Sequence, residues 1–534
     1  MNLARRIVRI ARACLRTYAT VNGLRARRDA RLFEQLLRRV SSVDVDQSDT
    51  LCVFSKPGSD TGFYGKLYPL IAYELSRQGV PCYFLFKSQS IGSHFSRLFV
   101  DSKEISNLLT TRKRIVRIEY EAGPGMYNDW VIDYEGQKME TQGINFFPLI
   151  RNTLITIYKK YNIDFGDVSI RDYCQDLIVT CDVLVYYFLL LKKYARDTGK
   201  KIRIIGLETN YTPNSVFKVL CSHFVEDRDV EFLDLARGNK AYFGYHFRDS
   251  FISVSNCTQF GVDNRNTVIE ADLRELEAEG SIHHDELISS IDGVIARQKE
   301  GSAIDGRNEV VEKIEAYRCR GSNIFVLFAH LFYDHPIYDD SPAFEDMCCW
   351  IRETVRFFED REDLLLLKPH PSEIRPEFPE KEPNETLASF VKGETLSSNI
   401  VLIHPRMFSL KELSEYMTCG LIWRSSAAFE LTYLRTPTII AGTPIYNVLD
   451  LGYARSREHY FQLIENVRDL EVSSSQIEDV AKYLYILDNR KHYYVDAIHY
   501  DQERKKYHWN KQALLECMNG NNQSLQQLTK IILT

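Results

Sequence analysis

Several common motifs are missing from this chain, and each absence excludes a class of protein. No CxxC pair occurs among the twelve cysteines, and only Cys348 and Cys349 are adjacent. Scattered cysteines are typical of reduced thiols in a cytosolic protein, not of a disulfide framework or a zinc site. The histidines form no HxxxH or HExxH pattern, and no carboxylate cluster accompanies them. We therefore expect no bound metal ion.

From the sequence pattern we expect neither a membrane span nor a secretory leader. No apolar run reaches the ~18 residues that a membrane helix needs. The longest run, VLVYYFLLL at 183–191, is expected to belong to a core helix. Arg9, Arg12 and Arg16 interrupt the apolar residues near the N-terminus, so a signal-peptide core is missing. We expect a cytoplasmic protein.

The charge is modest over the whole chain but uneven along it. A net charge of −6 gives no support to nucleic-acid binding. Residues 1–40 nevertheless hold eleven Arg against only Asp29 and Glu34. Over 3–21 the apolar residues and the arginines alternate at helical intervals, which predicts an amphipathic helix. Such a helix suits an anionic membrane surface, here through residues 1–21 at the inner leaflet; the alternative is a terminal helix packed on its own domain.

The first half of the chain opens like a nucleotide-binding fold. A predicted strand at 50–56 leads into a glycine-containing loop at 57–66 and a helical stretch at 67–78. The loop is neither a GxGxxG nor a Walker A pattern, so a binding loop and a plain turn both remain open. Further strands are predicted at 80–87, 114–119 and 201–207, with a mostly helical segment at 145–195.

The second half alternates strand and helix more regularly. Strands are predicted at 322–329, 364–368, 399–404, 419–423 and 437–441, with helices at 344–360, 410–417 and 427–434. This alternation predicts a parallel, doubly wound sheet. Two such halves in one chain predict an α/β protein with two Rossmann-like domains that face each other across a cleft.

Polar and turn residues follow each predicted strand of the second half. They include His330, the segment from Pro369 to Glu373, Arg406, the segment from Arg424 to Ser426, and Gly442. In an open α/β sheet, ligands bind at the carboxyl ends of the strands. Five such ends on one edge therefore predict a binding site.

The segment from Arg424 to Glu430 is the most informative of these strand ends. Ser425 or Ser426 is expected to cap the following helix, whose free N–H groups attract phosphate. Arg424 or Lys368 can add positive charge, and Glu430 can accept hydrogen bonds from ribose hydroxyls. The alternative is a capped core helix in which this glutamate has no role.

His370 lies between two prolines, which hold its backbone rigid. A histidine on such a loop can donate to a phosphate oxygen of a departing nucleotide. A core histidine is the alternative, although the position at a strand end disfavours it.

Several segments in this order resemble bacterial capsular and surface-polysaccharide glycosyltransferases, which include the Kdo transferases of capsule assembly. The segments are FVLFAHLFYDHP, FEDMCCWIRETVRFF, LLLLKPHPSE, NIVLIHP and SSAAFELTYLRTPTIIAGTPIY, and they fall within residues 322–465. Relatives often carry Trp-Asp-x-Ser where this chain has YDHP at 333–336, which leaves the acceptor and donor open. The resemblance is much vaguer over 50–260.

The resemblance implies a GT-B fold whose C-terminal domain binds a nucleotide-sugar and whose N-terminal domain binds the acceptor. It matches His370 and Pro371 to a donor-phosphate element, and Ser425, Ser426 and Glu430 to a second donor element. It implies a substrate but no cofactor and no catalytic metal. The implied acceptor is a surface polysaccharide or a lipid-linked glycan. The predicted donor-binding residues are Lys368, His370, Pro371, Glu373, Arg424, Ser425, Ser426 and Glu430.

Five segments follow from this organisation. They are a basic helical extension (1–40), an acceptor domain (41–258), a helical insertion or linker (259–318), a donor domain (319–470) and C-terminal helices that pack back on the domains (471–534).

The catalytic base is expected on the N-terminal domain. An inverting transferase needs a carboxylate or histidine within reach of the acceptor hydroxyl. Asp60 and Glu208, which follow predicted strands, are the candidates, and Asp129 and Asp133 are less well placed. All four can equally be ordinary surface carboxylates. Two other functions stay open: transfer of a CDP-linked polyol phosphate or epimerisation of a UDP-sugar, and a non-catalytic scaffold in a glycan assembly complex.

Overall fold

The computed structural model describes most of the chain outside its N-terminal extension. The described residues are 48–55, 64–87, 115–120, 130–206, 212, 215–224, 229–237, 251–256, 273–276, 278, 304–334, 341–374, 385–392, 396–444, 446–489, 493–501 and 506–533. The predicted basic helical extension at 1–40 lies outside them.

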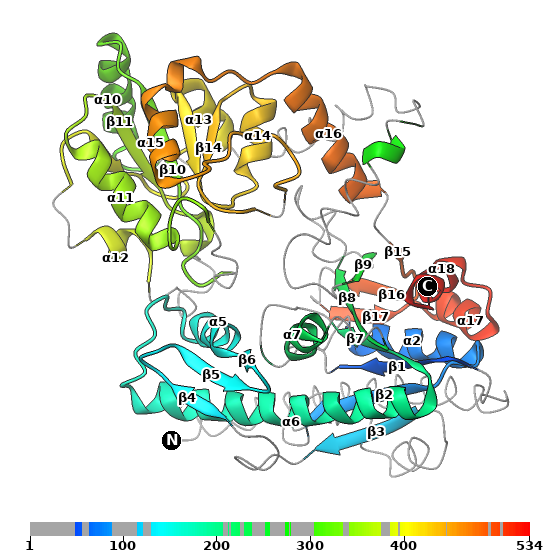
Figure 1. Cartoon of the computed structure of the whole chain (residues 1–534). Helices are drawn as coiled ribbons and strands as arrows, with labels where there is room; N and C mark the ends of the chain where they lie inside the picture. Colours follow the sequence, from blue (N-terminus) through cyan, green and yellow to red (C-terminus); the bar gives the residue numbers. More distant parts are fainter. Residues whose placement is uncertain are drawn as a thin grey trace, which may run out of the picture.

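The first domain is built on a seven-stranded sheet in the order β15-β9-β8-β7-β1-β2-β3 (Figure 1). Five neighbouring strands are parallel: β1 (Thr50–Phe54), β2 (Cys82–Lys87), β3 (Ile115–Tyr120), β7 (Lys201–Gly206) and β8 (Val230–Arg237). β9 (Phe251–Asn256) and β15 (Tyr493–Tyr494) extend the sheet as antiparallel strands. The chain leaves β1 on one side to form β2 and on the other to form β7, so a topological switch point lies between β1 and β7.

Helices cover both faces of this sheet and form an apolar core on each. Successive residues of β1 point to opposite faces, so they alternate between the two cores. Cys52 and Phe54 pack in the core under α2 (Tyr64–Arg77). Leu51 and Val53 pack in the core on the other face. That second core contains residues of α5 (Phe147–Tyr158), α6 (Val168–Thr198) and α7 (Val216–His223). The parallel α/β architecture predicted from the sequence is confirmed here.

The long helix α6 is apolar enough, by length and composition, to cross a membrane, with 56% of its most apolar window buried. Within the described residues it is the one helix that meets this test. Leu184, Val185 and Phe188 nevertheless pack in the core of the first domain. The prediction of a core helix at 183–191 is therefore confirmed.

A small antiparallel sheet, absent from the sequence-based prediction, lies beside α5. Its strands are β4 (Val131–Asp133), β5 (Lys138–Thr141) and β6 (Ile144–Asn145). Asn145 stabilises the turn into α5, since its Oδ1 accepts hydrogen bonds from the backbone N–H groups of Met139 and Phe147.

The second domain has a five-stranded, all-parallel sheet in the order β12-β11-β10-β13-β14. The strands are β10 (Ile324–Phe328), β11 (Leu364–Lys368), β12 (Ile400–Leu402), β13 (Cys419–Ile422) and β14 (Thr438–Ile440). All five predicted strands are confirmed. A second switch point lies between β10 and β13.

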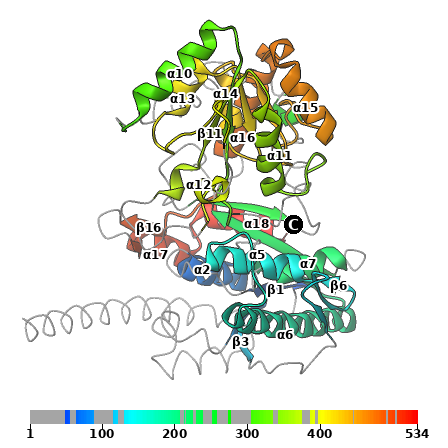
Figure 2. The same cartoon turned by 90° about the vertical axis from the view of Figure 1, so that its left-hand side faces the viewer.

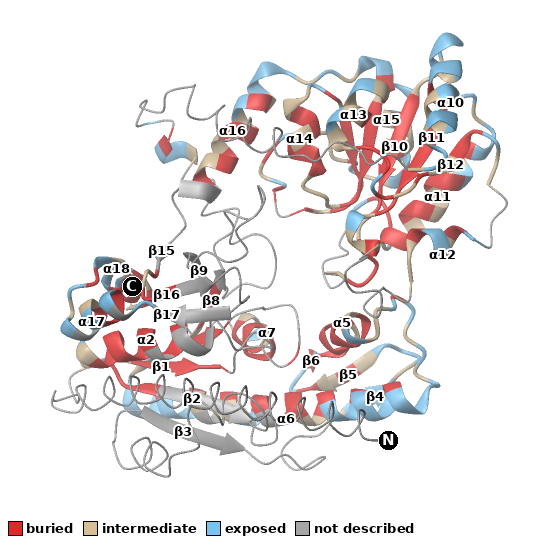
Figure 3. Ribbon diagram, turned by 180° about the vertical axis from the view of Figure 1, so that it is seen from behind, coloured by how far each residue is buried: buried red, intermediate tan, exposed pale blue. Residues whose placement is uncertain are grey.

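Two groups of helices enclose this sheet, as Figure 2 shows from the side. On one face lie α10 (Arg307–Cys319), α13 (Leu410–Tyr416), α14 (Ala427–Tyr433) and α16 (Ser474–Asn489), and on the other lie α11 (Met347–Glu359), α12 (Leu387–Val391) and α15 (Arg457–Glu465). β10 is buried along its whole length (Figure 3). Its residues are apolar at every position, as expected for a strand covered on both faces. The helix α10, from the segment predicted as a linker, contributes Ile314 to this core.

The C-terminal segment returns to the first domain after α16. β15 pairs with β9, and the hairpin of β16 (Ile498–Asp501) and β17 (Lys506–Trp509) follows. α17 (Lys511–Asn519) and α18 (Gln523–Leu533) then pack beside α2, with Leu525, Leu528 and Ile532 in the same core.

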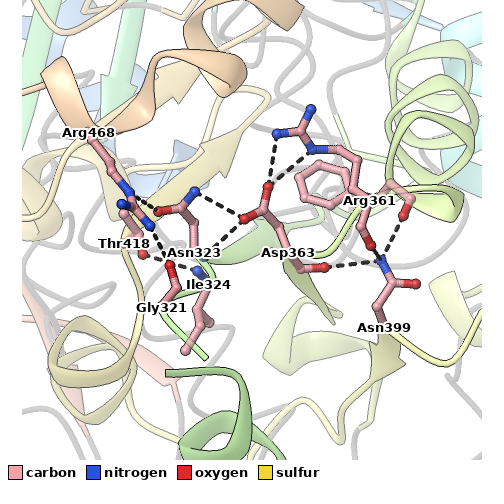
Figure 4. Close-up of polar contacts among 9 residues, drawn as sticks. Gly321, Asn323, Ile324, Arg361, Asp363, Asn399, Thr418 and Arg468 are labelled. Carbon is pink, nitrogen blue, oxygen red and sulfur yellow. Dashed lines mark hydrogen bonds and ion pairs between the residues drawn. The ribbon is translucent and has the colours of Figure 1, made fainter. Parts of the chain in front are cut away.

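A polar network ties together the amino ends of the second sheet (Figure 4). Asp363 accepts from the backbone and side chain of Asn323 and forms an ion pair with Arg361. The Asn399 side chain donates to three backbone carbonyls, those of Phe358, Arg361 and Asp363. These contacts lie at the sheet edge opposite the predicted site, so they stabilise the fold and leave the carboxyl ends available for ligands.

The loop after β10 contacts α5 of the first domain. Ile155 packs with Leu331 and Tyr333 in a small apolar cluster. Thr156 Oγ1 donates to the Tyr333 carbonyl at 3.2 Å, and Lys159 Nζ lies 4.1 Å from the Tyr333 ring centroid. The loop that leaves the central strand of the second sheet is thus attached to the first domain.

Candidate functional site

The strand register of the second sheet brings basic side chains into one row at its carboxyl edge. Phe328 of β10 pairs with Lys368 of β11 and with Ile422 of β13. Two residues after these aligned positions stand His330, His370 and Arg424. All three are half-buried; His330 and Arg424 flank the switch point between β10 and β13, and His370 follows the neighbouring strand β11. In sheets of this kind such a position binds ligands, and cationic groups there favour an anion.

His370 has a defined hydrogen-bonding pattern. Its Nδ1 accepts a hydrogen bond from the backbone N–H of Ser372 at 3.1 Å and caps the 3-10 turn at Pro371–Glu373. The neutral ring therefore carries its proton on Nε2, which makes Nε2 a donor. Pro369 and Pro371 restrict the backbone on either side, so the donor is held in place without a ligand.

His404 adds a further imidazole to this edge, after β12. Its Nδ1 accepts from the Arg406 backbone N–H at 3.2 Å. Burial, followed by the charges of Arg406 and Lys368, lowers the pKa of His404. The sequence-based prediction missed this residue because it placed the strand end at 404, whereas β12 ends at Leu402. It also named His330 as a strand-end residue without including it in the site.

The segment after β13 is tightly held. Ser425 Oγ accepts from the Ala427 backbone N–H at 3.2 Å, and the Ser425 carbonyl accepts from the Tyr446 hydroxyl at 2.6 Å. A side chain at Gly442 would begin 2.6 Å from the Trp423 carbonyl oxygen, so a glycine is required where β14 approaches this segment. The loop is therefore preorganised.

The first turn of α14 differs from the prediction of free N–H donors. The N–H groups of Ala427, Ala428 and Phe429 donate to Ser425 or Ser426. The helix has seven residues, so its dipole is short. Ser426 makes no side-chain cap bond, which leaves hydroxyls and cations as the main donors of this loop.

Glu430 lies one turn into α14 and is half-buried. Burial raises the pKa of its carboxyl to about 7. A carboxylate in such surroundings gains much from ligand hydroxyl groups that donate to it, because they replace water.

Lys368 and Glu373 are turned into the protein. Lys368 Nζ donates to the carbonyls of Pro405 at 2.7 Å and Phe408 at 3.1 Å, and burial lowers its pKa to about 8 against the opposite effect of Glu412. The Glu373 carboxyl accepts from the Leu387 backbone N–H at the start of α12. Both side chains therefore position neighbouring loops, and this geometry does not favour direct contact of either with a donor.

Of the four candidate carboxylates, Asp133 lies among the described residues. Asp60, Glu208 and Asp129 lie outside the described residues. Asp133 is exposed on β4 and accepts from the Gly136 backbone N–H at 2.9 Å. The strands that precede Asp60 and Glu208, β1 and β7, are neighbours at the first switch point. Within the described residues, no group of three or more His, Cys, Asp or Glu side chains could hold a metal ion.

Comparisons with known proteins give only remote similarities. No protein-family model matches the chain, and neither does any curated protein. Similar solved structures include KpsC of Thermosulfurimonas dismutans, a β-Kdo 2,7 transferase, with 14% identity, 62% of this chain and 89% of that chain covered, and a TM-score of 0.29. A UDP-GlcNAc 2-epimerase of Methanocaldococcus jannaschii has 10% identity, 82% and 98% coverage, and a TM-score of 0.25. The wall teichoic acid polymerase TagF has 12% identity, 98% coverage of both chains, and a TM-score of 0.19. Such values do not by themselves establish a substrate or a reaction.

Proposed function

We propose that this protein is a metal-independent glycosyltransferase that uses a nucleotide-sugar donor. The observation that carries the proposal is the preorganised set of His370, Arg424, Ser426 and Glu430 beside the switch point of the second sheet. It combines donors suited to a phosphate with a carboxyl group suited to sugar hydroxyls. A nucleotide-sugar presents both of these ligand groups, a phosphate and sugar hydroxyls.

The reaction follows from these positions. The bond between the sugar's anomeric carbon and the donor phosphate breaks while the acceptor oxygen bonds to that carbon. The phosphate keeps the electron pair, and His370 Nε2 and Arg424 stabilise its charge. A base removes the acceptor hydroxyl proton. We propose Asp60 or Glu208 for this role, because they follow the two neighbouring strands at the switch point of the first domain.

The acceptor that we propose is a surface polysaccharide or lipid-linked glycan, as the resemblance over 322–465 implies. A cytoplasmic enzyme held at the inner leaflet by residues 1–21 would meet such an acceptor where it is made.

Binding of the four nucleotides CMP, UDP, GDP and CDP tests the proposal. A ligand of the native state raises the melting temperature, so one nucleotide should do so. His370→Ala and Glu430→Ala should reduce that shift, and both should abolish glycan synthesis in a complementation assay. Product analysis with the active donor then separates sugar transfer from polyol-phosphate transfer and epimerisation. Undiminished glycan synthesis in both variants would instead indicate the scaffold role.

A further inference from the structure

His330 stands at the start of the loop that leaves β10, the central strand of the second sheet. Its ring lies beside that of His370, with centroids 5.9 Å apart and planes inclined by 44°. The register of β10 and β11 puts both residues two positions past the aligned pair Phe328 and Lys368. Two imidazoles therefore stand side by side on the edge where ligands bind.

The polar capacity of His330 is largely unused. Within the described part of the chain, its polar contact is a long one of 3.4 Å between Nδ1 and the Leu331 carbonyl oxygen. That contact favours a proton on Nδ1 and leaves Nε2 without a protein partner among the described residues. His370 has the opposite pattern, because its Nδ1 accepts from Ser372. A half-buried imidazole with an unused Nε2 beside a second, oriented imidazole is expected to serve a ligand, not the core.

The position of His330 is fixed by the loop that follows it. Leu331 and Tyr333 are buried against Ile155 of α5. The Tyr333 carbonyl accepts from Thr156 Oγ1. The ring is thus carried by a segment held at both ends, by β10 on one side and by the first domain on the other. Little conformational entropy of this segment is therefore lost when the ring contacts a ligand.

We propose that His330 is a second imidazole contact for the phosphate that His370 binds, and that it acts through Nε2. When the His330 ring is protonated, three donors stand in a row at this edge. They are His370 after β11, His330 after β10 and Arg424 after β13. This inference rests on the proposed function. It adds His330, which follows β10 and so lies between the residues that follow β11 and β13. It also requires a ligand that carries a phosphate.

The test compares affinities for the stabilising nucleotide and for its nucleoside by calorimetry. His330→Ala should weaken the nucleotide at least tenfold, as expected for loss of a charge-assisted hydrogen bond, and leave the nucleoside unchanged. His330→Gln places a donor near the position of Nε2 and should restore most of the affinity. His330→Asn, whose amide nitrogen lies near the position of Nδ1, should not. His223→Ala, on α7 of the first domain, is the matched control.

The outcomes separate the two proposals. If the wild type binds none of the nucleotides, the proposed function fails and this inference fails with it. If His370→Ala weakens binding and His330→Ala does not, only the inference is overturned. Equal recovery by Gln and Asn, or equal loss for the nucleoside, also overturns it. The Gln and Asn variants keep the side-chain size, so they decide the question even if the Ala variant does not fold.

Discussion

Replacing Glu373 by Gln should make the second domain less sensitive to pH. This carboxyl is 4% exposed, and burial raises its pKa to about 7 from the ordinary 4.5, although the Leu387 N–H acts in the opposite direction. Gln keeps a carbonyl oxygen that can accept from the same N–H. The substitution therefore removes the ionisation while preserving the hydrogen bond to the start of α12.

The sign and size follow from proton linkage. Below about pH 4.5 the carboxyl is neutral in both the folded and the unfolded chain. As the pH rises through about 7, the unfolded chain ionises first, so the free energy of unfolding falls. The shift of pKa corresponds to about 3 kcal/mol. The Gln variant should lose none of this free energy. Its free energy of unfolding, relative to that of the wild type, should therefore rise by about 3 kcal/mol between about pH 4.5 and about pH 8.

Urea unfolding followed by tryptophan fluorescence measures this difference. Trp350 and Trp423 are buried in the second domain with ring centroids 5.7 Å apart, so their emission reports its unfolding. The exposed Glu362→Gln serves as the control and should show no pH-dependent difference from the wild type. A difference between Glu373→Gln and wild type that is independent of pH would refute the reasoning. A large loss of nucleotide affinity would instead place Glu373 in contact with the donor.

Three further predictions address the network, the ribose contact and the N-terminal helix. Asn399→Ala should lower the free energy of unfolding by about 2 kcal/mol, because three carbonyls lose a donor, without changing nucleotide affinity. The ratio of wild-type to Glu430→Gln nucleotide affinity, measured by calorimetry, should rise with pH through about 7, as Glu430 ionises and becomes a better acceptor. Deleting residues 2–21 should release the protein from anionic liposomes in co-sedimentation while nucleotide binding persists; unchanged co-sedimentation contradicts the membrane role.

Much of the second sheet could be predicted because its strands are short apolar runs with sharp ends. The run of leucines at β11 gave its limits without error, since Asp363 precedes it and Pro369 follows it. β12 was harder, because Ile403 continues the apolar run past the last paired residue, Leu402, and His404 follows it directly. That shift of two residues concealed His404 within a predicted strand.

The first domain was less predictable because some of its paired strands are distant from each other in the sequence. β15 pairs with β9 across more than two hundred residues, and no local pattern indicates such a pairing. The small sheet of β4, β5 and β6 consists of strands of two to four residues, which are too short to show periodicity.

Side-chain direction was the other limit of the sequence-based prediction. The sequence places Lys368, His370 and Glu373 on one strand end but does not show where each side chain points. The structure separates them: Lys368 and Glu373 bind backbone groups of neighbouring loops, while His370 is oriented by Ser372. The loop before α13 supplies the carbonyls that Lys368 binds, and the start of α12 supplies the N–H group that Glu373 binds.

The most direct test of the central claim is the melting-temperature shift that CMP, UDP, GDP and CDP produce in the wild type and in His370→Ala. We predict that one nucleotide raises the melting temperature of the wild type and that the variant loses most of that increase, while the control His223→Ala keeps it. No shift with any nucleotide, or an equal shift in His370→Ala, would contradict a donor-phosphate site at the carboxyl edge of the second sheet.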